Sequence, residues 1–174
     1  MDTGPDSQTL IRNIKSMKMD VRDIERVVIS HWHSDHTGGL LSFLNYRNSI
    51  LDADGVGKAR ITVDVHPDRP IARGIAKSPD YKEVVARLPE DPAFDSIQEA
   101  GAILEKSDVG HVVANGTVYV SGEIPRVTPY EGGLLSGVRW SEQNGEGKWI
   151  KEEVRRNVTS FKKSPLRIIS AING

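Results

Sequence analysis

The sequence predicts a mixed α/β domain of the α+β kind, because helical and extended patterns alternate along its 174 residues. Residues 10–17 carry apolar side chains on one helical stripe, and residues 40–46 are apolar around most of a helix. Residues 27–29 form a short apolar run, and residues 61–65 alternate apolar and polar side chains as a half-buried strand does. A chain of this length can build the core of one domain and is too short for two.

The remaining elements follow from local signals. Asp6 or Ser7 can cap the first helix, and a short helical turn near residues 21–25 leads into the first strand. Residues 96–100 have the pattern of a helix end and residues 102–104 that of a strand. Residues 112–120 place Asn115-Gly116, the preferred two-residue hairpin turn, between two β-rich arms. The proline-rich segment 68–92 is either a lid over a site or an ordinary surface connection.

Composition narrows the classes of partner. The 23 basic and 24 acidic residues give a net charge of −1, so charge favours neither nucleic acid nor an acidic membrane. The chain has no cysteine, so any metal must be bound by nitrogen and oxygen. No stretch approaches the ~18 apolar residues of a membrane span, and the polar start lacks a signal-peptide pattern. We therefore expect a soluble, cytoplasmic protein whose partner is a small-molecule substrate, with no nucleic acid and no membrane.

The end of the chain changes character. Between Arg155 and Arg167 lie five basic residues and no acidic one, followed by the apolar run 166–172. This segment is either a solvated basic tail or a patch that binds phosphate or a partner. We accordingly divide the chain into a domain at 1–153 and a basic C-terminal tail at 154–174.

The densest chemical signal is the segment 30–39, which reads S-H-W-H-S-D-H-T-G-G and directly follows the first predicted strand. It places His31, His33, Asp35 and His36 within six positions. Imidazole and carboxylate are the usual ligands of zinc and similar divalent metals. The alternative is a histidine-rich surface loop, or core histidines satisfied by backbone hydrogen bonds. The pattern favours a metal site at a strand-loop-helix corner.

The same four residues, spaced H-x-H-x-D-H, resemble the signature of the metallo-β-lactamase superfamily. The resemblance implies a partial αββα sandwich with mixed β-sheets and flanking helices, and a site for one or two metal ions at a sheet edge. It further implies that His31, His33, Asp35 and His36 are the metal ligands.

Three other segments are similar to one branch of that superfamily. They are Asp2-Thr-Gly-Pro, Val65-His66-Pro67-Asp68 and the G-E-I-P-R sequence at 122–126. The branch is the dihydropteridine (7,8-dihydropterin-6-methyl-aminobenzene-phosphate) synthase-like one, and the wording W-H-S-D-H-T-G-G-L-L resembles its fungal members. The resemblance extends from residue 2 to about residue 153.

The chain departs from that branch at both ends. Strands that precede the D-T-G motif in the branch have no counterpart, and neither does a later C-S-H-A-G-like loop whose histidine completes a metal shell. We therefore expect a truncated member with two protein ligands per shell, in which only His66 and His111 remain to supply a third imidazole. Exposed sheet edges would then favour a homo-oligomer.

The resemblance implies a zinc-dependent hydrolase of an ester, thioester, lactone or lactam, with one or two zinc ions, or with iron or manganese instead. Asp35 would orient or deprotonate the attacking water. His66, Glu123 and Arg126 would face substrate, although Glu123 and Arg126 could equally form a strand-end ion pair. Two alternatives stay open: a catalytically impaired chain that acts as a binding or regulatory protein, and an iron-dependent oxidoreductase on the same scaffold.

Overall fold

The computed structural model describes residues 2–55, 57, 60–77, 79–125, 134–142 and 145–152, and the backbone of 143, 157–163 and 167–170. Its helices and strands follow in chain order: α1 Thr9–Ser16, β1 Arg26–Val28, α2 Ser34–Thr37, α3 Leu40–Ala53, β2 Ile61–Val65, β3 Arg73–Ala76, β4 Val84–Arg87, α4 Phe94–Glu99, β5 Ala102–Lys106, β6 His111–Val113, β7 Val118–Glu123, β8 Gly137–Gln143, β9 Glu146–Lys151, β10 Asn157–Lys163 and β11 Arg167–Ser170. No described helix is long and apolar enough to cross a bilayer.

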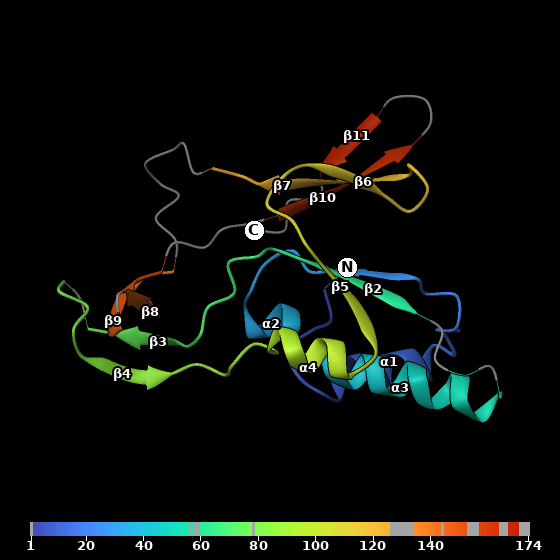
Figure 1. The fold of residues 1–174 in the computed structure, drawn as a ribbon, viewed down its shortest axis with the longest axis horizontal. Helices are drawn as coiled ribbons and strands as arrows, with labels where there is room; N and C mark the ends of the chain where they lie inside the picture. The colour runs from blue at the N-terminus through green and yellow to red at the C-terminus, as the bar shows by residue number, and fades with distance from the viewer. Residues whose placement is uncertain are drawn as a thin grey trace.

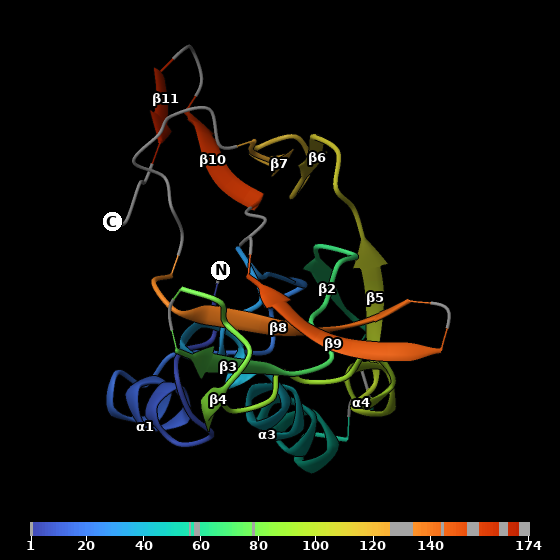
Figure 2. The same ribbon diagram turned by 90° about the vertical axis from the view of Figure 1, so that its left-hand side faces the viewer.

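The described strands form three small sheets (Figure 1). The parallel sheet has the order β1-β2-β5, and the two antiparallel sheets have the orders β4-β3-β8-β9 and β11-β10-β7-β6. Figure 2 shows the β4-β3-β8-β9 sheet in front of the parallel sheet, with α1, α3 and α4 below. The predicted mixed α/β class is confirmed, and the strands are divided among three sheets where a sandwich of two was expected.

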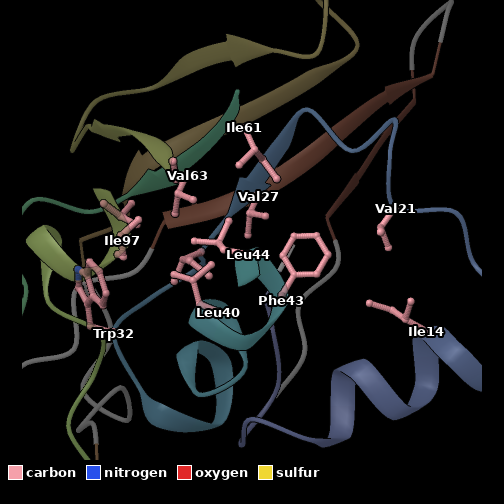
Figure 3. Packing of buried hydrophobic residues seen from close by; sticks show 13 residues of the cluster. Ile14, Val21, Val27, Trp32, Leu40, Phe43, Leu44, Ile61, Val63 and Ile97 are labelled. Carbon is pink, nitrogen blue, oxygen red and sulfur yellow. The ribbon is translucent and has the colours of Figure 1, made fainter. Parts of the chain in front are cut away.

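The core lies between the parallel sheet and α3 (Figure 3). Leu40, Phe43 and Leu44 of α3 point toward Val27 of β1 and Val63 of β2. Every residue of β2 except Thr62 is buried, although the sequence alternates. The central strand of a parallel sheet is covered on both faces, which explains this difference from the predicted half-buried strand.

Leu44→Ala tests how much this core contributes to stability. Leu44 is 0 % exposed, so the substitution removes buried apolar surface and leaves a cavity. We expect the free energy of unfolding to fall by about 2–5 kcal/mol, as measured by urea denaturation. Leu135→Ala is the control, because Leu135 is 86 % exposed and should change stability very little. Equal effects of the two substitutions would contradict this placement of the core.

Several boundaries differ from the sequence prediction. Helix α3, predicted over residues 40–46, continues to Ala53. Met17 is exposed and does not belong to the buried stripe of the first helix. The hairpin connection has four residues, from Ala114 to Thr117, because Ala114 and Asn115 join Gly116 in the positive-φ region. Segment 68–92 contributes β3 and β4 to a sheet with β8, so its proline-bounded middle is paired strand.

Candidate metal centre

The histidine loop, residues 30–39, connects β1 to α3 and contains the short helix α2. His33 is extended (φ −134°, ψ 143°), and its carbonyl accepts the backbone N–H groups of His36 and Thr37. This turn brings the three imidazoles together. The centroid of the His31 ring lies 4.6 Å from that of His33 and 4.1 Å from that of His36. The predicted clustering of the three histidines is therefore present in the fold.

Asp2 orients two of these histidines. Its carboxylate accepts the Ser30 N–H and the Ser30 hydroxyl, each at 2.7 Å, and His36 Nδ1–H donates to it at 2.7 Å. Because the single Ser30 hydroxyl proton goes to Asp2, His31 Nδ1–H donates to Ser30 Oγ at 3.0 Å. In its neutral form each ring, protonated on Nδ1, carries its lone pair on Nε2, the arrangement that metal-binding histidines adopt.

Hydrogen bonding keeps Asp2 ionised. Burial by itself raises the pKa of the Asp2 carboxyl, but hydrogen bonds from Ser30 and His36 outweigh burial and lower that pKa below 3.8. In the sequence, Asp2 stands out only as part of the D-T-G-P segment, and nothing in its local pattern marks it as a site residue. That segment was the signal that could have identified it.

The glycine pair of the loop accommodates the same N-terminal segment. A Cβ at Gly38 would overlap the Pro5 carbonyl, and one at Gly39 would overlap the Thr3 carbonyl. Both the N–H and the hydroxyl of Thr3 donate to the His36 carbonyl, at 2.7 and 2.9 Å. Residues 2–5 are therefore packed directly on the histidine loop, which fixes Asp2 beside His36.

Asp35 is the most exposed of the four predicted metal ligands. Its side chain is 67 % exposed, and its Oδ2 lies 3.3 Å from His36 Nε2. A carboxylate in this position is accessible to solvent at the rim of the loop. Its placement suits contact with a water molecule beside His36 better than a buried structural role.

Two of the predicted substrate residues lie together. His66 follows β2, is 2 % exposed, and accepts the Asp68 N–H at Nδ1, so the proton of the neutral ring is on Nε2. That nitrogen lies 3.4 Å from Glu123 Oε2 at the end of β7. Trp32 Nε1 donates to the His66 carbonyl at 2.7 Å, which ties this pair to the histidine loop. Arg126, the third predicted substrate residue, lies outside the described residues.

His111 is engaged away from the histidine loop. Its Nε2–H donates to Asp64 Oδ2 at 2.8 Å and its Nδ1–H to the Val109 carbonyl at 2.9 Å. Both partners accept protons, so this geometry belongs to the charged imidazolium. His111, one of the two histidines that the sequence left to supply a third imidazole, instead joins β6 to the buried Asp64 of β2.

This pairing predicts a pH dependence of stability. Burial lowers the pKa of His111, but the Val109 and Asp64 hydrogen bonds raise it by more, to above 6.5. The stabilisation is then complete below the unfolded-state pKa and is lost as pH rises through the folded-state pKa. We expect the stability difference between wild type and His111→Asn, measured by urea denaturation, to shrink as pH rises above 6.5. A stability difference that stays constant from about pH 5 to about pH 9 would contradict this linkage.

A buried ionic network, not anticipated from the sequence, lies on the other side of the loop. Arg73 of β3 donates to Asp91 Oδ2 at 3.0 and 3.2 Å, and Thr37 of α2 donates to Asp91 Oδ1 at 2.6 Å. Glu152 follows β9, with Oε1 3.8 Å from Arg73 Nε and 3.7 Å from His33 Nε2. These residues are far apart in the sequence, and no local motif marks them.

The donor set fits a divalent metal in its chemistry. Three clustered imidazoles are present, and His33 Nε2 is buried with no hydrogen-bond partner among the described residues. A bound metal would satisfy that nitrogen. Within the described ranges, however, no three His, Asp or Glu side chains are grouped closely enough to form a complete site. Binding therefore requires side-chain movement within the loop or a further ligand.

Comparison with protein families gives a match to the first part of the chain. Residues 1–53 match the family model described as the metallo-beta-lactamase superfamily. The matched segment includes Asp2, which orients His36, and all of H-x-H-x-D-H. No curated protein matches the chain. The match over residues 1–53 therefore supports the metallo-beta-lactamase superfamily, a family of hydrolases that typically bind metal ions, often zinc.

Proposed function

We propose that the chain is a zinc-dependent hydrolase that cleaves an ester, thioester, lactone or lactam. The observation that carries this proposal is the Asp2-Ser30-His36 arrangement, which presents His31 and His36 with Nε2 lone pairs beside the partnerless His33 Nε2. The superfamily match over the same residues supports it. The G-E-I-P-R and V-x-H-P segments favour the dihydropteridine synthase-like branch, with a fungal-type sequence, as the closer relationship.

His31, His33, Asp35 and His36 are the proposed metal ligands. When bound, the metal supplies a water of lowered pKa and polarises the substrate carbonyl. Asp35, exposed beside His36, would orient the attacking water or accept its proton. Asp2 and Ser30 keep the imidazoles in the orientation that leaves Nε2 toward the metal.

His66 and Glu123 are the proposed substrate residues. His66 Nε2 lies 3.4 Å from Glu123 Oε2, and no hydrogen bond joins the two side chains. A buried imidazole N–H of fixed tautomer can donate a hydrogen bond to a substrate oxygen if Glu123 moves aside. Trp32 holds the His66 backbone next to the loop, so substrate bound there would lie near the histidines.

A second candidate is a catalytically impaired chain that acts as a binding or regulatory protein. It is favoured by the finding that the described residues contain no complete group of three metal ligands. Iron or manganese in place of zinc is a third possibility, because two imidazoles and a carboxylate also bind Fe(II).

Metal content separates these candidates. Protein prepared without chelator should contain about one or two zinc ions per chain by elemental analysis, as a catalytic site of three protein ligands predicts. It should then hydrolyse at least one member of a panel of esters, thioesters, lactones and lactams. Iron in place of zinc would favour redox chemistry. Protein without any bound metal, even after zinc is added, would overturn the hydrolase proposal and favour the binding protein.

A further inference from the structure

We propose that Glu152 is a carboxylate ligand of the metal at the histidine loop, so that His31, His33 and Glu152 form a three-ligand shell. This inference rests on the proposed function, because it concerns the same centre. Glu152, which follows β9, would be the third ligand of this shell, a role that no histidine of the described chain fills. Glu152 belongs to none of the sequence segments that suggested a metal site.

The first observation is the distance between the side chains of Glu152 and His33. Glu152 Oε1 lies 3.7 Å from His33 Nε2, which is too long for a hydrogen bond. If His33 were an imidazolium paired with this carboxylate, a separation of about 2.7–2.9 Å would be expected. Two ligands of one tetrahedral zinc, each about 2.1 Å from the ion, lie about 3.4 Å apart. The observed separation is closer to that of two ligands of one ion.

The second observation is that both side chains have unsatisfied buried atoms. Glu152 is 3 % exposed, and neither its Oε2 nor His33 Nε2 has a hydrogen-bond partner among the described residues. A buried carboxylate oxygen without a partner is costly. Two such atoms on neighbouring side chains, both of types that bind zinc, point to one shared cation.

Glu152 shares its nearest positive charge, Arg73, with Asp91. Arg73 hydrogen-bonds to Asp91, and its Nε is 3.8 Å from Glu152 Oε1. Arg139 donates to both oxygens of Asp68, at 2.7 and 2.6 Å. Each arginine is thus matched by an aspartate, and Glu152 is the additional negative charge. The charge of Glu152 also acts on Arg139. The pKa of Arg139 is raised mainly by its hydrogen bonds to Asp68, while burial opposes this increase and the charges of Asp68 and Glu152 add to it.

The backbone positions Glu152 for this role. Its N–H donates to the Gly137 carbonyl at 2.9 Å, which holds the end of β9 against β8. The Thr37-Asp91-Arg73 bonds hold the same sheet against α2. The His31 ring lies 4.6 Å from the His33 ring, so His31 and Glu152 each lie beside His33, and the side chains must rotate to share one ion. Two histidines and a glutamate are a known zinc ligand set.

The test compares zinc affinity in wild type, Glu152→Gln and Glu105→Gln by competition with a chromophoric chelator. Glutamine keeps the shape of Glu152 and removes its charge, so circular dichroism should show a folded protein. We expect zinc affinity to fall about 100-fold or more in Glu152→Gln, beyond the 10–100-fold typical of residues that only support a ligand. Glu105→Gln, the same change in the exposed partner of Arg26, should leave it unchanged.

Glu152→Asp provides a second variant, and Co²⁺ a second readout. The shorter carboxylate keeps the charge near Arg73 but should still weaken zinc binding, by about tenfold, and alter the visible spectrum of the Co²⁺ form. Wild-type affinity in either variant would overturn the role of Glu152 and leave the hydrolase proposal standing. Wild type that binds no zinc at all would overturn both.

Discussion

Replacing His33 with alanine is expected to remove most of the bound zinc and to reduce hydrolysis about 100-fold or more. His33 Nε2 is the buried nitrogen without a partner, and it lies beside both His31 and Glu152. The metal contributes several kcal/mol to such a reaction, and each 1.36 kcal/mol corresponds to tenfold in rate. Zinc per chain and the initial rate on the best substrate of the panel are the two measurements.

His111→Ala is the matched control for this substitution. It removes another imidazole, but one that is bound to Asp64 and Val109. We expect the control to keep its zinc and most of its activity at pH values where it is folded. If His33→Ala retained the zinc and turnover of wild type, the histidine loop could not be the catalytic centre.

Asp91→Ala is expected to cost about 3–5 kcal/mol of stability, the range measured when one partner of a buried ion pair is removed. Asp91 and Arg73 are both buried, and Asp91 also accepts the hydroxyl of Thr37. Alanine would leave a buried guanidinium with Glu152 as its nearest anion and would release α2 from the sheet of β3 and β8. Calorimetry should show a melting temperature lower by about 10 °C.

The comparison for Asp91→Ala is Glu83→Ala, which breaks the Lys77–Glu83 pair. Both of those side chains are mostly exposed, although their N–O distance is 2.8 Å. An exposed pair is worth about 0–1 kcal/mol, so this substitution should barely change the melting temperature. A similar small effect of Asp91→Ala would show that the network does not hold the sheet to the loop.

Local sequence determined the elements that depend on nearby residues. The strand before the histidine loop and β2 were predicted close to their observed bounds, and the helix after the loop was predicted at its observed start but seven residues too short. Hydrophobic periodicity carries that information, because each pattern repeats within one element. Turn geometry was less well predicted, as the four-residue connection around Asn115 shows, because alternative positive-φ arrangements have similar local signals.

The candidate site shows the same division between features set by local sequence and features set by tertiary structure. The sequence by itself identified the candidate metal ligands, since His31, His33, Asp35 and His36 lie within six positions of one loop. Only the tertiary structure decided what surrounds them. Asp2 reaches His36, and Glu152 reaches His33, across long stretches of chain. Such contacts depend on how the sheets pack around α2, and packing is set by the whole core rather than by any local pattern.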